Sequence, residues 1–155
     1  MKYLVVPETS IPQGRLVYRK REYSLDFLLD ESRLYGGYTL CIDTLQIEVD
    51  PVDQLLLYPW GYFPHTSWQQ GRLPKFDAPL GRIRVVTEKE WEPGIAISIG
   101  DRSDWRAIFD ESLGLIRLAK DTLYKRHDHI QIAPNVVASL FQNDLVALWL
   151  RPEFV

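Results

Sequence analysis

The sequence predicts a mainly β protein, with an α+β arrangement as the alternative. Segments rich in β-branched and aromatic residues recur roughly every 10 residues, with turn residues between them. Ten Pro and nine Gly disfavour long helices. Both observations indicate antiparallel hairpins that form a sandwich- or barrel-like domain with one or two short helices. The 155 residues, 46% hydrophobic and 25% charged, have the length and composition of a single globular domain spanning residues 1–155.

The clearest hairpin is expected between residues 38 and 60. Residues 38–49 alternate between apolar and polar side chains, and the alternation changes parity at Asp43-Thr44, which predicts a bulge or a break there. Asp50-Pro51-Val52-Asp53 has the residues of a type I turn, with Asp first and Pro second. Residues 54–60 then return as a strand that is apolar on both faces, which predicts a central and covered position.

Two further hairpins are expected in the second half of the chain. Residues 104–118 alternate around a loop that ends in Gly114, where a left-handed backbone is needed. Residues 136–150 form the last hairpin, with its turn at 142–144, and a helix over 136–150 is the competing interpretation.

Several shorter elements complete the predicted fold. The segment 87–91 predicts one helical turn that is stopped by Pro93-Gly94. The segment 24–34 is compatible with a short helix instead of a strand. Further short strands are expected at 3–6, 23–29, 82–86, 95–99 and 129–132.

The sequence indicates a soluble cytoplasmic protein with no membrane partner. Residues 1–8 lack the apolar core of a signal peptide, and no run approaches the length of a membrane span. The single cysteine, Cys41, cannot form an internal disulfide and is expected to be a small buried hydrophobe.

Charge is distributed unevenly along the chain. The formal net charge is −3, and no Lys or Arg lies between Arg33 and Arg72. That stretch contains Glu48, Asp50 and Asp53, which flank the predicted turn and are expected to be exposed to solvent. The basic residues near positions 15–21 are balanced by neighbouring acids, so a nucleic-acid partner is not expected.

The segment 60–68 holds four aromatic residues in nine. One interpretation is a packed corner in which Trp60 and Phe63 fill the core. Aromatic side chains are also the favoured anchors of protein interfaces. The second interpretation, compatible with the first, is a binding surface with three side chains directed outward: Tyr62, His65 and Trp68.

The residues that could carry chemistry form no specific catalytic motif. His127 and His129 would lie on one face of a strand, but a zinc site needs a third ligand, and Asp121, Asp144 or His65 could supply one only if the fold brought it near. A solvated surface pair is the preferred interpretation, so we expect no metal and no other cofactor. The sequence holds no nucleophile elbow, phosphate-binding loop or dinucleotide fingerprint, and no catalytic residue is assigned.

Three stretches, 42–64, 105–116 and 145–152, resemble small immunity proteins of bacterial polymorphic toxin systems. This resemblance implies a protein that binds and neutralises one cognate toxin domain, and it implies no catalytic residues. Toxins that act on nucleic acids are commonly basic at their active face, where an acidic protein can dock.

We therefore expect a toxin-neutralising protein whose partner is its cognate toxin. The alternatives are a small His-dependent or metal-assisted hydrolase or nuclease, and a structural subunit of a larger assembly. A pocket that holds His65, His127 and His129 together would favour the enzyme, whereas scattered histidines and an acidic face would favour the binding protein. The partner-binding residues predicted under the first hypothesis are Glu48, Asp50, Asp53, Tyr62, His65 and Trp68.

Overall fold

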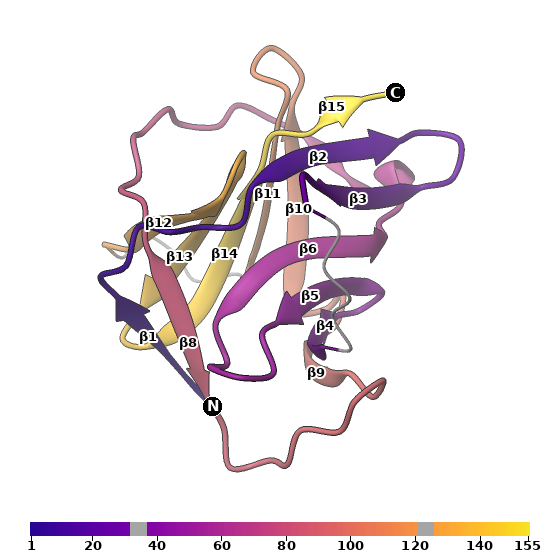
Figure 1. Cartoon of the computed structure of the whole chain (residues 1–155). Coiled ribbons are helices and arrows are strands. Elements are labelled where there is room, and N and C mark those ends of the chain that lie inside the picture. Colours follow the sequence, from indigo (N-terminus) through magenta and orange to yellow (C-terminus); the bar gives the residue numbers. More distant parts are fainter. Residues whose placement is uncertain (32–36, 121–125) are drawn as a thin grey trace.

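The computed structural model describes residues 1–31, 37–120 and 126–155, and its regular structure is almost entirely β-strand (Figure 1). The larger sheet has seven strands in the order β15 (Glu153–Phe154), β2 (Gly14–Arg19), β3 (Ser24–Leu29), β6 (Leu56–Tyr62), β5 (Leu45–Val49), β4 (Tyr38–Ile42) and β9 (Ile97–Gly100). The second has six strands in the order β12 (Asp128–Ala133), β13 (Val136–Phe141), β14 (Asp144–Leu150), β11 (Leu115–Lys120), β10 (Trp105–Asp110) and β7 (Gln69–Gln70).

A two-stranded ribbon and one short helix complete the described residues. The ribbon pairs β1 (Lys2–Val6) with β8 (Arg82–Val86), and the helix is the 3₁₀ turn η1 (His65–Ser67). The predicted mainly β class is therefore confirmed. Within the described ranges, no helix has the length and apolar character needed to cross a bilayer.

The main core lies between the two large sheets. Side chains alternate along each strand, so Leu45 and Ile47 of β5 point inward, as do Leu148 and Leu150 of β14. The β1–β8 ribbon spans one side of this sandwich, because Leu55 next to β6 bridges Arg84 of β8, and Leu80 bridges Gln131 of β12. The described strands do not close into a barrel, so the arrangement is sandwich-like.

The predicted hairpin between residues 38 and 60 is three paired strands rather than two. Ile42 pairs with Leu45, so Asp43 and Thr44 form a tight two-residue turn, with Asp43 at φ 52°. The break expected there is confirmed, whereas a bulge within one strand is wrong. The turn after β5 is also confirmed, and β6 lies centrally between β3 and β5.

The other hairpins follow the predicted pattern. β10 and β11 are joined by a loop that ends in Gly114 at φ 61°. β13 and β14 are joined through Gln142 and Asn143, both at positive φ, so the helix considered for 136–150 is wrong. The shorter strands expected along the chain correspond to β1, β3, β8, β9 and β12.

Neither of the short helices considered at 87–91 and 24–34 is found among the described residues. The segment 87–91 forms no helical turn, so that prediction is wrong, and the Trp91 ring stacks on Tyr38 of the larger sheet at 5.1 Å between ring centroids. For the segment 24–34, residues 24–29 are strand β3, and residues 32–34 lie outside the described residues. The single domain stays a prediction.

Candidate partner-binding site

Four carboxylates surround a hollow of about 530 Å³ where β3 ends and β6 begins. We call this feature the acidic hollow, and it comprises Asp30, Glu31, Asp50, Asp53 and Arg82. The first two acids follow β3, and the next two lie on the β5–β6 turn. Two segments that are distant in sequence therefore place their negative charges around the same hollow.

The hollow exists because two neighbouring strands separate. β3 and β6 pair only through Ser24 with Tyr62 and Leu25 with Gly61. Beyond these pairs, Phe27 of β3 stacks against Tyr58, with 4.7 Å between the ring centroids. The ladder is thus replaced by a ring contact, and the strand ends stay apart at the hollow.

The β5–β6 turn fixes two of the carboxylates. One oxygen of Asp50 accepts a hydrogen bond from the Val52 N–H at 2.8 Å, and one oxygen of Asp53 accepts from the Leu55 N–H at 3.1 Å. Such local bonds hold short acidic side chains at turns. The other oxygen of each carboxylate accepts no hydrogen bond from a described residue, so it is available to a partner.

Among the described residues that line the hollow, Arg82 is the one cation, and it is 9% exposed. Its Nη1 donates to the Ser10 carbonyl oxygen at 2.7 Å, whereas its buried Nε has no partner among the described residues. Within the described ranges, none of the four carboxylates of the hollow belongs to an ion pair. Among the described residues, the four carboxylates of the hollow therefore outnumber its single arginine and have no ion-pair partner.

Glu48 does not belong to this hollow, and the prediction that it is exposed is wrong. Glu48 is only 8% exposed, and its carboxylate accepts a hydrogen bond from Trp60 Nε1 at 3.0 Å. Gly37 passes so close that a Cβ added there would collide with the Glu48 side chain. Burial raises the pKa of Glu48 above its usual range, and the Trp60 hydrogen bond opposes that rise.

The aromatic segment folds into a packed corner, which we call the aromatic corner: Tyr18, Phe63, His65 and Trp68. The Tyr18 hydroxyl donates to the Phe63 carbonyl oxygen at 2.7 Å and accepts from the His65 N–H at 2.9 Å. Burial raises the pKa of Tyr18 to about 12, so the hydroxyl keeps the proton that it donates. Tyr18 lies on β2, a strand that the sequence analysis did not predict.

Trp68 joins the two sheets through this corner. Its ring lies 4.9 Å from Tyr18, 5.1 Å from Phe63 and 5.5 Å from Phe109 of β10, between ring centroids. The expected outward orientation of Trp68 is therefore wrong, because its ring is half-buried. Trp60 is 39% exposed, so its predicted place in the core is also wrong.

The six predicted partner-binding residues thus separate into groups. Asp50 and Asp53 line the acidic hollow, and Glu48 lies buried beside Trp60. Tyr62 is 48% exposed, and its ring contacts Tyr23 at 6.2 Å. His65 and Trp68 belong to the aromatic corner. Their roles in partner binding stay predictions.

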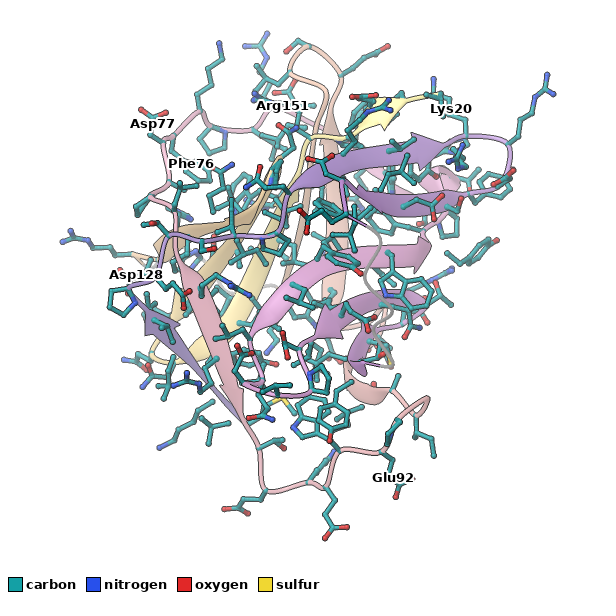
Figure 2. All side chains as sticks on the ribbon, viewed as in Figure 1. Lys20, Phe76, Asp77, Glu92, Asp128 and Arg151 are labelled. Carbon is teal, nitrogen blue, oxygen red and sulfur yellow. The ribbon has the colours of Figure 1, made fainter. Side chains whose placement is uncertain are left out.

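The two histidines near β12 lie on one face, as predicted, with 6.2 Å between their rings. His129 is half-buried, because Phe76 stacks on it at 4.1 Å, and its Nδ1 lies 2.6 Å from Ser139 Oγ. Phe76 lies on the segment that crosses the outer face of the six-stranded sheet (Figure 2). The expectation of a solvated pair is therefore wrong for His129, whose pKa is lowered by burial and by His127.

The three histidines lie at two separate places in the described structure. His65 contacts Tyr18 and Tyr23, whereas His127 and His129 contact Phe76 and Phe141, so the three histidines do not converge. Within the described ranges, no group of three or more His, Cys, Asp or Glu could hold a metal ion. Asp121, one considered ligand, lies outside the described residues.

The thiol of Cys41 is a poor candidate nucleophile. The residue lies on β4 and is half-buried rather than fully buried as predicted. Burial raises the pKa of the thiol above its usual range, which disfavours the reactive thiolate.

No protein-family model matches the chain, and no curated protein matches its sequence significantly. The function is therefore argued from the geometry of the chain's own residues.

Sequence reasoning missed three residues of the hollow: Asp30, Glu31 and Arg82. Asp30 and Glu31 directly follow the apolar pair Leu28-Leu29 at the end of a predicted strand, so a pair of exposed acids could have been recognised there. Their proximity to the β5–β6 turn depends on β3 lying next to β6, which local sequence does not encode. Arg82 is brought to the hollow by the β1–β8 ribbon, and no local pattern indicates that contact.

Proposed function

We propose that the chain is a cytoplasmic binding protein of the immunity type, which docks on a basic surface of a cognate toxin domain through the acidic hollow. The observation that carries this proposal is the set of carboxylates around the hollow with no ion-pair partner in the described ranges. A partner's Lys and Arg side chains would supply the missing positive charge.

The physical advantage of such a surface is rapid and selective encounter. Carboxylates that converge around a concave surface concentrate negative potential there, which steers a cationic partner towards it. The apolar atoms of Leu29, Leu57 and Tyr58 also line the hollow, so the aliphatic stem of an inserted Lys or Arg has apolar contacts. Docking on the active face of a toxin would exclude its substrate without any chemistry by this chain.

The first experiment identifies the partner and tests the hollow. The chain is expressed with an affinity tag in its native host, and co-purified proteins are identified by mass spectrometry. The combined change Asp30→Lys and Glu31→Lys reverses two charges whose side chains hold no local turn in the described structure. We expect the wild-type chain to retain a basic partner and the double variant to lose it.

The matched control is Glu88→Lys with Glu90→Lys, which changes net charge by the same amount on the exposed segment between β8 and β9. This control should retain the partner. Equal retention by the wild-type chain and the hollow variant would contradict the docking site. A recovered partner with no toxic activity in the host would contradict the immunity role while leaving the docking site intact.

A further inference from the structure

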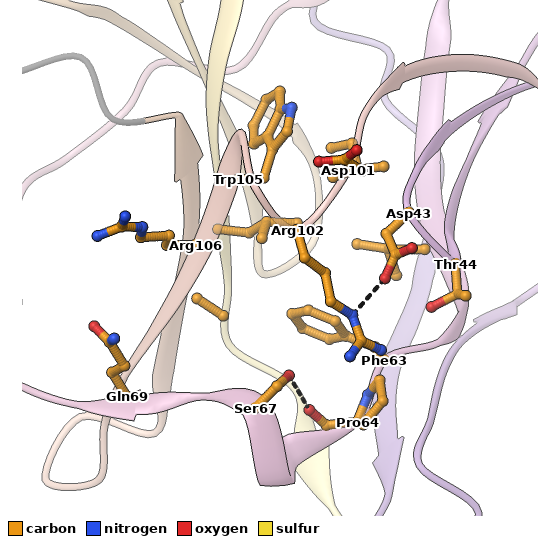
Figure 3. Close-up of a pocket in the computed structure, with 14 residues that line it drawn as sticks. Asp43, Thr44, Phe63, Pro64, Ser67, Gln69, Asp101, Arg102, Trp105 and Arg106 are labelled. Atoms are coloured by element: carbon orange, nitrogen blue, oxygen red, sulfur yellow. Dashed lines mark hydrogen bonds and ion pairs between the residues drawn. The ribbon is translucent and has the colours of Figure 1, made fainter.

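A second concave feature lies at the open edge between the two large sheets. It has a volume of about 250 Å³ and is bounded by the β4–β5 turn, the start of η1 and strand β10 (Figure 3). It shares no lining residue with the acidic hollow, so it is independent of the proposed docking function. We call it the inter-sheet cleft.

The floor of the inter-sheet cleft is apolar and comes from both sheets. Leu45 and Phe63 belong to the seven-stranded side, and Trp105 belongs to β10 of the six-stranded side. All three residues are less than 9% exposed overall. The remaining apolar residues of the lining are Ile42, Pro64, Ala107 and Leu118. An apolar floor of this kind favours an apolar ligand group through the hydrophobic effect.

The rim of the cleft is polar, and its charges are already balanced. Arg102 reaches across the mouth, and its Nε donates to an Asp43 carboxylate oxygen at 2.6 Å (Figure 3). The other acid of the rim, Asp101, accepts from the Ser103 N–H at 2.7 Å. Asp43 and Asp101 are matched by Arg102 and Arg106, so the four charged residues of the rim sum to zero. A charged ligand would meet a compensated rim and an apolar floor.

From this geometry we infer that the inter-sheet cleft binds a small, uncharged aromatic group. An apolar protein cavity of about 150 Å³ accommodates benzene, so a cleft of about 250 Å³ has room for a bicyclic ring. The uncharged amide of Gln69 lines the rim and can hydrogen-bond a single polar atom on such a ring. The group could come from a free molecule or from an aromatic side chain of another protein, because both present the same chemistry.

The test is a titration of the full chain with indole, followed by NMR shifts of the tryptophan indole N–H groups. We expect a saturable shift of the Trp105 signal, assigned with Trp105→Phe, and a dissociation constant of about 1 mM or tighter. Indole-3-carboxylate should bind at least about tenfold more weakly, because its charge must be desolvated at the apolar floor. N-acetyl-tryptophanamide distinguishes the two sources: comparable binding indicates a protein side chain, and much weaker binding indicates a free molecule.

Two variants locate the binding. Ala107→Leu fills the floor, and Gln69→Trp covers the mouth from an exposed strand position, where misfolding is not expected. Both should weaken indole binding at least about tenfold. The matched control is Gln70→Trp, because Gln70 is the exposed neighbour on β7 and does not line the cleft.

Binding that is lost in the Gln69 variant and kept in the Gln70 variant supports the inference. Absence of a saturable shift with indole, or equal binding of indole and its carboxylate, would overturn it. Neither result bears on the acidic hollow, so a failure here is distinct from a failure of the proposed docking function.

Discussion

The acidic hollow and the aromatic corner both contain polar groups on a β framework, but they satisfy those groups differently. In the aromatic corner, the Tyr18 hydroxyl donates to the Phe63 carbonyl and accepts from the His65 N–H, so the bonding capacity of this hydroxyl is used inside the chain, whereas the buried Nε1 of Trp68 has no partner among the described residues. In the hollow, Asp50 and Asp53 each use one oxygen for the turn and leave the other without a described partner.

The difference separates stability from recognition. Groups that are satisfied internally, and rings that contact both sheets, stabilise the fold. Exposed carboxylates contribute little to folding free energy, but they can attract a cationic partner. Substitutions in the corner should therefore lower stability, whereas substitutions in the hollow should lower association.

The largest expected effect is on stability and comes from Trp68→Ala. The ring contacts Tyr18 and Phe109 from opposite sheets, so its removal leaves a gap between them. We expect a loss of about 3 kcal/mol in the free energy of unfolding, measured by urea titration. If the chain is one domain, circular dichroism and tryptophan fluorescence should report a single shifted transition. A variant as stable as the wild-type chain would place Trp68 outside the core contacts.

A smaller effect on stability is expected from His129→Gln. His129 lies outside both the acidic hollow and the aromatic corner, so this variant tests the burial of a third place in the fold. Burial and the nearby charge of His127 lower the pKa of His129 below its usual value. The unfolded chain then binds more protons than the folded chain, so stability is full above about pH 6.5 and falls as the pH drops through the folded pKa. His129→Gln should flatten the dependence of Tm on pH between about 7 and 5. An unchanged slope would mean that His129 is not desolvated.

The smallest expected effect comes from Glu48→Gln, which distinguishes a buried acid from the exposed acids of the hollow. Burial raises the pKa of Glu48, so ionising it in the folded state is unfavourable at neutral pH. This cost disappears as the pH falls below the folded pKa. The Gln side chain still accepts the Trp60 N–H, so the variant should be more stable at pH 7 by less than about 1 kcal/mol and show no gain at pH 4. A lower Tm at pH 7 would contradict the assignment.

The strands were predictable from sequence where the pattern is local. β8 follows from a short β-branched run, and the β13–β14 hairpin follows from two apolar runs around Gln142 and Asn143. The sequence analysis does not predict β2, although apolar Leu16 and Tyr18 lie between Arg15 and Arg19, because it weighs this segment only for its charge.

Non-local pairing was not predictable. Within the described ranges, three pairs of strands are parallel, and each joins segments that are separated by other strands: β15 with β2, β9 with β4, and β7 with β10. No local pattern encodes such pairs, because their register is set by packing of the whole sandwich. The same reason explains the candidate site: Asp50 and Asp53 were predicted from the turn, but Asp30 and Arg82 reach them only through tertiary contacts.

The burial of Glu48 and Trp68 was also outside the reach of local pattern. Both residues lie in a stretch without Lys or Arg, which favoured an exposed acidic surface. Glu48 is instead covered by Gly37, which directly precedes the neighbouring strand β4, and Trp68 is covered by side chains of both sheets. Charge patterning identifies where potential is concentrated, but it does not identify which carboxylates face solvent.

We propose that the acidic hollow steers a basic partner to the chain. Steering is measured as the association rate with the co-purified partner, by stopped flow, over a series of salt concentrations. The combined variant Asp30→Asn, Asp50→Asn and Asp53→Asn removes charge, and Asn retains the oxygen acceptors of the turn at positions 50 and 53.

The control is Glu88→Gln, Glu90→Gln and Glu92→Gln, which removes the same charge on the exposed segment between β8 and β9. We expect the hollow variant to associate about tenfold more slowly at low salt, with a flatter salt dependence and an unchanged Tm, while the control behaves as the wild-type chain. Equal rates and equal salt dependence for the hollow variant and the wild-type chain would show that the acidic hollow does not steer the partner.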